Sequence, residues 1–413
     1  MLSELINISS WVVSTAASVP LAALSAELLC ALLPARSSVE KSGAARKRIA
    51  VLIPAHNESA MIEATVRSIK TQLTSSDRLL VVADNCTDNT ADLALRGGAE
   101  VIERSDATNR GKGYALDYGV RHLAANPPEI LIIVDSDVRV RTGSLDALAD
   151  QVIATKRPAQ SVYILQPPDG AGMRDQISHL AFTVRNRIRP RGLMRLAGIC
   201  PLFGAGMAFP WEIIAAAPLA SGNIVEDLAL GLDLAAQGHG PMLCEAARVD
   251  GTLVTIEHED NLKQRRRWEH GHMRTLLHQA PQTVLKGIAN ARPRAVMLGL
   301  DVMIPPLSLM AAIASAAIAG LLILALAPGV TLAPALMLAS WLLITGALVV
   351  GTWLRFAECD RPLRPLLAIP GYVIRKLPLY ASFFTRAEHS WQRAARPANP
   401  ETTEAAATDK HAA

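Results

Sequence analysis

Short apolar runs alternate with amphipathic stretches over residues 48–155. The runs are rich in Val, Ile and Leu, and the stretches between them repeat apolar residues at helical spacing. Strands that alternate with helices predict βαβ units in a parallel sheet, whose strands are apolar throughout because both faces are covered. The predicted strands are 48–54, 78–83, 99–103 and 130–134, and the predicted helices are 60–73, 90–97, 112–125 and 144–155.

Two much longer apolar stretches flank the rest of the chain. The second, residues 295–354, contains one charge, Asp301. A membrane-spanning helix needs about 20 apolar residues, so this stretch holds two spans, at about 306–326 and 333–354. The preceding residues, 295–305, are predicted to be an interfacial lead-in because they contain Asp301.

The N-terminal stretch, residues 5–35, also contains one charge, Glu27. It is long for a signal peptide, and Glu4 stands where such peptides carry basic residues. We predict a third span here; a helix lying on the bilayer surface is the alternative.

Basic residues set the predicted orientation. They follow the first span, precede the second and follow the third, whereas the loop at 328–333 has no charge. By the positive-inside rule, the central region and the C-terminal tail are cytoplasmic, and the protein is a multi-pass protein of the inner (cytoplasmic) membrane. The predicted parts are a transmembrane helix (1–35), a cytoplasmic domain (36–294), the lead-in with two transmembrane helices (295–354), an interfacial amphipathic segment (355–398) and a disordered tail (399–413).

Composition excludes several classes of protein. The net charge of the 413 residues is only +4, without the basic excess of a nucleic-acid binder, so we expect no nucleic-acid partner. The five cysteines are odd in number and none are at C-x-x-C spacing, which argues against a disulfide framework and a structural zinc site.

Polar residues follow three of the predicted strands. Strand 48–54 runs into Pro54-Ala-His-Asn-Glu58, strand 78–83 is followed by Asp84, and strand 130–134 is followed by Asp135-Ser-Asp137. Ligands of open α/β sheets bind outside the carboxyl ends of the strands. Asp135 and Asp137 project to the same side of extended backbone, and their oxygens suit Mg²⁺ or Mn²⁺.

Four further features each have two interpretations. Lys112, in a Gly-Lys-Gly that opens a helix, suits an anion, but such a turn is also ordinary. Glu226 and Asp227 offer either a general base or the solvated face of a helix. Gln264-Arg-Arg-Arg-Trp268 offers either a juxtamembrane basic helix or Arg267 on a diphosphate and Trp268 on a sugar. An arginine run over 185–195 faces either lipid headgroups, which we favour, or an anionic substrate.

Taken in order, these motifs resemble family 2 glycosyltransferases, in the membrane-bound branch that includes cellulose and hyaluronan synthases. The matching segments run from about Ile49 to Trp268 and then into the membrane helices. The Q-x-x-R-W motif is complete. Two motifs depart from the family pattern, with Ala83 in place of an Asp before Asp84, and Val225 in place of the Thr before Glu226.

The resemblance implies a GT-A fold, an α/β nucleotide-diphospho-sugar transferase domain, here on about three transmembrane helices. It also implies roles for single residues. Asp227 would be the catalytic base. Donor-binding residues would be Pro54, Glu58, Asp84, Lys112, Asp135, Gln264 and Arg267, acceptor-binding residues would be Phe203, Gly204, Glu226 and Trp268, and the Mg²⁺ or Mn²⁺ ligands would be Asp135 and Asp137.

The implied activity is inverting transfer of a sugar from a nucleotide sugar, UDP-linked by resemblance, to a lipid-linked or growing glycan acceptor. The product would be a β-linkage in exopolysaccharide or cell-surface polysaccharide synthesis, with membrane lipids and other polysaccharide-assembly proteins as candidate partners. Three spans are few for a polymer channel, which favours one or a few additions. The alternatives are a non-catalytic, nucleotide-sugar-binding subunit of a synthase complex and, with less support, a transporter.

Overall fold

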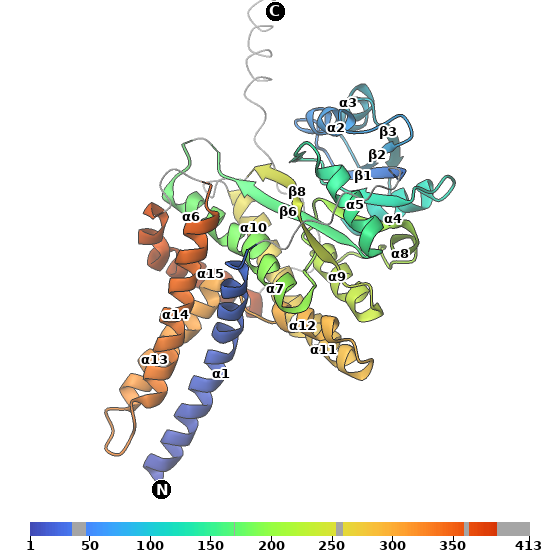
Figure 1. Cartoon of the computed structure of the whole chain (residues 1–413). Coiled ribbons are helices and arrows are strands. Elements are labelled where there is room, and N and C mark those ends of the chain that lie inside the picture. Colours follow the sequence, from blue (N-terminus) through green and yellow to red (C-terminus); the bar gives the residue numbers. More distant parts are fainter. Residues whose placement is uncertain (35–46, 169, 253–258, 359–362, 386–413) are drawn as a thin grey trace, which may run out of the picture.

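The computed structural model describes residues 1–34, 47–168, 170–252, 259–358 and 363–385, and the predicted tail at 399–413 lies outside them. A sheet domain stands on a group of long helices (Figure 1). The strands are β1 (Ile49–Ala55), β2 (Arg78–Asp84), β3 (Glu100–Arg104), β4 (Ile130–Ile133), β5 (Val138–Val140), β6 (Ala159–Gln166), β7 (Met207–Pro210) and β8 (Met242–Thr252). The helices of the sheet domain are α2 (Ile62–Lys70), α3 (Thr90–Arg96), α4 (Lys112–Leu123), α5 (Ser144–Thr155), α8 (Trp211–Ala215) and α9 (Glu226–Gln237).

The remaining helices connect the sheet domain to the apolar spans or form the spans. They are α1 (Leu2–Ala31), α6 (Met173–Thr183), the π-helix η1 (Val184–Ile188), α7 (Arg189–Ala197), α10 (Glu259–Arg274), the π-helix η2 (Thr275–Gln279), α11 (Ala280–Ala289), α12 (Pro293–Val302), α13 (Leu307–Leu324), α14 (Ala333–Phe356), the 3₁₀-helix η3 (Arg364–Ala368) and α15 (Ile369–Thr385). All eight elements predicted between residues 48 and 155 are present, with ends that differ by at most three residues.

The sheet has eight strands in the order β3-β2-β1-β4-β7-β6-β8-β5. The first four pair in parallel, as predicted, and β1 lies between β2 and β4. The prediction of a wholly parallel sheet was wrong beyond β4, because β7 pairs antiparallel with both β4 and β6, and β5 pairs antiparallel with β8. The change of direction at β4 and β7 places the loop before β7 beside the carboxyl end of β4.

Apolar side chains fill both faces of the sheet. On one face, Ile49, Val51 and Ile53 of β1 pack with residues of α2, α3 and α5. On the other, Ala50 and Leu52 pack with residues of α4, α8 and α9. Alternate residues of one strand thus enter different cores, which explains why β1 is apolar throughout.

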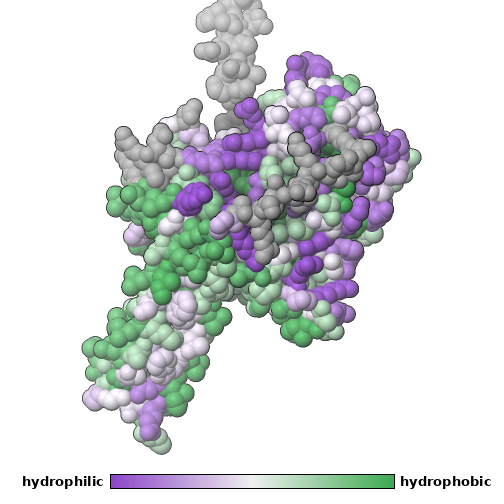
Figure 2. Space-filling view, viewed as in Figure 1, coloured by the Kyte–Doolittle hydropathy of each residue, from purple (hydrophilic) through white to green (hydrophobic). Residues whose placement is uncertain are grey.

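In the part of the chain that the structure describes, three helices are long and apolar enough to cross a membrane: α1, α13 and α14. They extend together from one side of the sheet domain (Figure 1), and hydrophobic side chains cover much of their surface, whereas hydrophilic ones gather over the sheet domain (Figure 2). The predicted spans therefore correspond to helices of sufficient length, and the predicted lead-in corresponds to the separate helix α12. The orientation of these helices and the inner membrane as their location stay predictions.

The single charges of the two apolar stretches meet on one arginine. Arg189, the first residue of α7, lies 2.8 Å from Oε2 of Glu27 and 2.7 Å from Oδ1 of Asp301. At most 13% of each of the three side chains is exposed. Burial disfavours the charge of Arg189, but Asp301 and Glu27 outweigh it and raise the pKa of this guanidinium. The interaction joins α1, α7 and α12 through charges that have little access to water.

A backbone contact lies beside this ion triad. A Cβ atom placed on Gly192 would lie 2.0 Å from the carbonyl oxygen of Glu27, so no other residue fits at this crossing of α7 and α1. The next arginine, Arg191, donates from Nε to the carbonyl of Ala31 at 2.9 Å. The prediction that the 185–195 run faces lipid headgroups was wrong for Arg189, which is directed into the protein.

We expect Arg189→Gln to lower the free energy of unfolding by about 3–5 kcal/mol, because it leaves two buried carboxylates without their cation. Thermal unfolding of detergent-purified protein, followed by tryptophan fluorescence, measures the change. Arg96→Gln is the matched control, since Arg96 is exposed on α3, and it should change stability by less than about 0.5 kcal/mol. Equal unfolding temperatures for the two variants would show that the triad contributes nothing.

Candidate active site

The ends of β2, β1 and β4 lie side by side, so the polar residues that follow them share one edge of the sheet. Asp84 is the last residue of β2, and 6% of it is exposed. Its Oδ1 accepts a hydrogen bond from Arg104 at 2.6 Å and another from Asn85 at 3.0 Å. Arg104 also lies over the ring of Tyr114, with 5.7 Å between the guanidinium carbon and the ring centroid. A cation therefore lies beside Asp84, and an aromatic ring lies beside that cation.

The segment Pro54–Glu58, which begins with the last two residues of β1, is fastened to the turn after β2. Asn57 has a left-handed backbone, with φ of 55°, and its side-chain oxygen accepts a hydrogen bond from the Thr87 amide at 2.6 Å. The amide of Glu58 donates to Oγ1 of Thr90 at 2.7 Å. These bonds hold the two loops together as one wall of the site.

Lys112 gathers carboxylates from two distant parts of the chain. As the first residue of α4, it lies with Nζ 2.5 Å from Oδ1 of Asp135 and 3.5 Å from Oε1 of Glu226. Nζ also donates to the carbonyl oxygen of Gly204 at 3.0 Å. The three acidic neighbours Asp135, Glu226 and Asp227 all raise the pKa of Lys112, against the effect of its burial. The lysine therefore stays charged and neutralises part of the acidic cluster.

Gly204 closes this cluster from the other side. Its backbone is left-handed, with φ of 88°. A Cβ atom at this position would lie 3.1 Å from Oδ2 of Asp227, 3.3 Å from Nζ of Lys112 and 3.7 Å from Oδ2 of Asp135. The loop at 203–206 is anchored beside it, because the Phe203 amide donates to Oε1 of the buried Gln160 at 2.8 Å. Only a glycine allows the loop to approach these charges so closely.

The carboxylates differ in how readily they hold a proton. Burial raises the pKa of Glu226 from its ordinary value of 4.5 to about 7, with Lys112 lowering it and Asp227 raising it. Burial also raises the pKa of Asp135; Lys112 acts in the opposite direction and the charge of Asp137 adds to the increase. The site thus contains more negative charge than one lysine compensates.

Asp135 and Asp137 offer carboxylate oxygens to a cation. The loop that carries them is held in place by Thr65, whose hydroxyl donates to the carbonyl of Ser136 at 2.8 Å. Within the described part of the chain, no group of three or more His, Cys, Asp or Glu side chains is arranged to hold a metal ion. A divalent cation on these two carboxylates would therefore take its remaining ligands from water or a bound diphosphate, as Mg²⁺ commonly does.

Helix α10, which carries the Q-x-x-R-W motif, packs beside the start of α9. A Cβ atom on Gly271 would lie 3.0 Å from the Val225 side chain, next to Glu226. Trp268 packs on Phe182, with ring centroids 6.3 Å apart. The Arg267 side chain is half-buried, whereas that of Gln264 lies outside the described residues. The contacts bring the helix to the site, and the sugar and diphosphate roles of these three residues stay predictions.

Arg185 lies near the site, and none of the sequence motifs assigns it a role. It lies in η1, where burial lowers the pKa of its guanidinium, while the charges of Asp227 and Glu269 act to raise it. Among the described residues it makes no hydrogen bond or ion pair. A half-buried arginine with no partner among the described residues favours an anionic ligand, because an unpaired charge is costly to desolvate. The sequence signal was the arginine run at 185–195, but the pattern did not separate Arg185 from its neighbours.

Comparison with known proteins identifies the family to which the chain belongs. The sequence model of glycosyl transferase family 2 matches residues 50–208, and that of glycosyl transferase family group 2 matches residues 130–354, more than half of the chain. The chain belongs to family 2 of the glycosyltransferases.

The sequences of related proteins align with parts of this glycosyltransferase. Glucosyl-3-phosphoglycerate synthase of Mycobacterium tuberculosis is 37% identical over 100 residues, which are 23% of this chain and 30% of that protein. An uncharacterised glycosyltransferase of Mycobacterium bovis is 28% identical over 219 residues, which are 50% of this chain and 91% of that protein. The chain therefore spans less than a third of the mycobacterial synthase.

A solved structure resembles nearly the whole chain. The mannosyltransferase of Pyrobaculum calidifontis, in complex with GDP-Man and Mn²⁺, has a TM-score of 0.53 and 19% identity, over 93% of this chain and 99% of that chain. At this identity the similarity shows the fold alone, which is GT-A as predicted. Membership of the family also confirms the prediction of an enzyme, and so favours it over the alternative of a non-catalytic subunit. The finer assignment to the cellulose and hyaluronan synthase branch stays a prediction.

We expect Gly204→Ala to destabilise the glycosyltransferase by about 1–3 kcal/mol, because the left-handed backbone becomes strained and the methyl group crowds Asp227 and Lys112. Thermal unfolding measures the change. Gly172→Ala is the control, because nothing lies within 4 Å of a Cβ atom there and its φ is −67°. Identical unfolding temperatures would mean that the loop does not hold its position against the acids.

The raised pKa of Glu226 predicts a pH-dependent stability. Between pH 4.5 and 7 the native enzyme keeps a proton that the unfolded chain loses, so this group's contribution to stability decreases as the pH rises through that range. Glu226→Gln should remove this part of the decrease, measured as unfolding temperature against pH in metal-free buffer. Parallel curves for the wild type and the variant would contradict the raised pKa.

Proposed function

We propose that this glycosyltransferase moves a sugar from a nucleotide sugar, UDP-linked by resemblance, to a lipid-linked or growing glycan acceptor at the inner membrane, with inversion to a β-linkage. The observation that carries the proposal is the cluster of Asp135, Glu226 and Asp227 around Lys112, at the end of the parallel strands. Its place in exopolysaccharide or cell-surface polysaccharide synthesis, with the 36–294 domain in the cytoplasm, belongs to the same proposal.

In this proposal the donor lies along the ends of β1, β2 and β4. The segment Pro54–Glu58, together with Asp84, would face the nucleoside, where Arg104 binds the Asp84 carboxylate and lies over the Tyr114 ring. Lys112, Arg267 and Arg185 are the cations available to the diphosphate. Gln264, which the motif assigns to the donor, would complete this side of the site.

Mg²⁺ or Mn²⁺ would be held by Asp135 and Asp137, and when bound it would stabilise the negative charge of the departing diphosphate. The residues fit a cation, because two carboxylates one residue apart, in the loop between β4 and β5, offer the oxygen ligands that Mg²⁺ and Mn²⁺ prefer. The mannosyltransferase with the similar fold was solved with Mn²⁺ and GDP-Man, which supports a metal and a nucleotide sugar as a class.

Asp227 would accept the proton of the acceptor hydroxyl, which then attacks the anomeric carbon from the face opposite the diphosphate. Its Oδ1 accepts a hydrogen bond from the Leu228 amide at 2.8 Å, and Oδ2 lies on the side of Gly204. Phe203, Gly204, Glu226 and Trp268 would line the acceptor side. Glu226, whose pKa is about 7, is the second carboxylate positioned to exchange a proton.

We expect Asp227→Asn to lower transfer by about 10²–10⁴-fold while donor binding stays largely intact, because the amide cannot take the proton. Release of nucleoside diphosphate from a panel of nucleotide sugars, with Mn²⁺ and membrane lipid extract, measures transfer; calorimetry measures donor binding. Asp233→Asn, on the same helix α9, is the matched control.

Two outcomes would contradict this assignment. Loss of donor binding in a folded Asp227→Asn protein would remove the residue from the base role. Retained transfer in Asp227→Asn, together with loss in Glu226→Gln, would assign the proton to Glu226 instead. A third outcome concerns the acceptor: if release of nucleoside diphosphate by the wild type requires the lipid extract, this would support a lipid-linked acceptor.

A further inference from the structure

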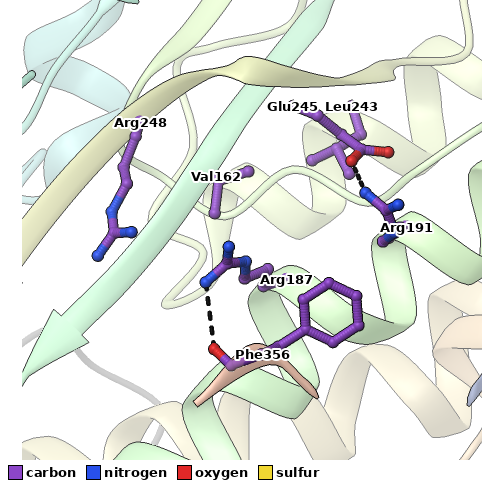
Figure 3. A pocket seen from close by; sticks show the side chains of 7 residues that line it. All are labelled: Val162, Arg187, Arg191, Leu243, Glu245, Arg248 and Phe356. Carbon is purple, nitrogen blue, oxygen red and sulfur yellow. Dashed lines mark hydrogen bonds and ion pairs between the residues drawn. The ribbon is translucent and has the colours of Figure 1, made fainter. Parts of the chain in front are cut away.

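A second site lies between the sheet domain and the long helices. It is a pocket with about 400 Å³ of empty volume, including space open to solvent. Side chains of β6 and β8 approach it from one side, those of η1 and α7 from another, and the end of α14 from a third (Figure 3). Its lining residues are Val162, Arg187, Arg191, Leu243, Glu245, Arg248 and Phe356.

Guanidinium groups outnumber carboxylates around this arginine pocket. Glu245 is shared between Arg191 and Arg195. Glu358, just after α14, is likewise shared between Arg187 at 2.7 Å and Arg248 at 2.5 Å. Arg248 also binds Asp250 at 2.8 Å, so among the described residues three carboxylates pair with four arginines. Arg187 donates there from Nη1, to the carbonyl of Phe356 and to Glu358, and its Nε and Nη2 remain for a further anion.

The arginines also crowd one another. Burial, together with the charges of Arg195, Arg187 and Arg355, lowers the pKa of Arg191 to about 10. Arg187, Arg191 and Arg355 each lie 5.4 Å from the centroid of the Phe356 ring. An anion placed among these groups would relieve repulsion between like charges.

The pocket lies where two apolar helices end. Phe356 is the last residue of α14, and Arg191 donates to the carbonyl of Ala31, the last residue of α1. Basic pockets at this level of a membrane protein bind the headgroups of anionic lipids. The pocket is distinct from the active site, because Arg185 of the same helical segment lies in the field of Asp227, whereas Arg187 lines the pocket.

We propose that the arginine pocket binds the phosphate group of an anionic molecule, and that a phospholipid headgroup is its source. Arginine suits this ligand because its planar fork binds two phosphate oxygens at once. The apolar residues Val162, Leu243 and Phe356 leave room beside the charges for the glycerol of a headgroup. A bound lipid would connect β6 and β8 to the ends of α1 and α14.

The test uses the full chain, purified in detergent, and a matched pair of variants at Val162. Val162→Glu places a carboxylate in the pocket, whereas Val162→Gln adds nearly the same shape without charge. Native mass spectrometry with added phosphatidylglycerol or phosphatidylcholine counts the lipids bound. We expect phosphatidylglycerol to bind the wild type and Val162→Gln, and to bind Val162→Glu at least about tenfold more weakly, because like charges repel. Phosphatidylcholine should not bind at this site.

A second measurement separates the two sources of phosphate. A ligand that binds only the native state raises the unfolding temperature. Phosphatidylglycerol in nanodiscs should therefore stabilise the wild type more than Arg187→Gln, whereas inorganic phosphate in phosphatidylcholine nanodiscs should have no such effect. Stabilisation by inorganic phosphate alone, lost in Arg187→Gln, would keep the phosphate site and overturn the lipid source.

Two results would overturn the proposal as a whole. One is equal binding of phosphatidylglycerol by Val162→Glu and Val162→Gln, with Arg187→Gln also unaffected. The other is the absence of any response to phosphatidylglycerol or inorganic phosphate. If the Val162 variants fail to fold, Arg187→Gln alone decides, because its unfolding temperature can be compared with and without each ligand.

Discussion

The edge of the sheet where β1, β2 and β4 end, here called the catalytic edge, depends on the interactions of the Lys112 ammonium group. Strand ends, the loop at Gly204 and the start of α9 all carry groups that would repel one another or stay unsatisfied without it. Asp135 and Glu226 are separated by 91 positions in the sequence and meet only because both approach the same cation. The residues expected to handle donor, metal and proton are therefore coupled electrostatically, and a change in charge at one alters proton binding at the others.

A second set of charges joins this edge to the apolar helices. The continuous segment from α6 through η1 to α7 carries arginines that serve different regions. Arg185 lies in the field of Asp227, Arg189 binds Glu27 and Asp301, and Arg187 and Arg191 line the arginine pocket. A π-helical turn lies within this segment, at η1. Such turns change the direction in which successive side chains point, and they are frequent at functional sites.

The sequence predicted the parallel half of the sheet well, because each strand there is a continuous apolar run bounded by polar turns. It did not predict the antiparallel half. Strands such as Val138–Val140 and Met207–Pro210 are short, and their pairing is set by contacts far along the chain. The acidic residues of the site were found from their positions after strands, but the contact between Lys112 and Gly204, over 92 positions, has no local signal. The opposite directions of Arg185 and Arg187 likewise depend on packing that the run of arginines does not encode.

The crossing of α7 and α1 at Gly192 has a geometric consequence. The main chains of α7 and α1 approach each other closely there, and any side chain at position 192 would push α1 away from the sheet domain. This close approach helps to set the height of the catalytic edge above the ends of the apolar helices. Lengthening α1 at its N-terminal end would change how far the helix extends from the domain, yet leave that height unchanged. For the lipid-linked acceptor that we propose, the reactive hydroxyl would then lie at the same elevation in membranes of different thickness.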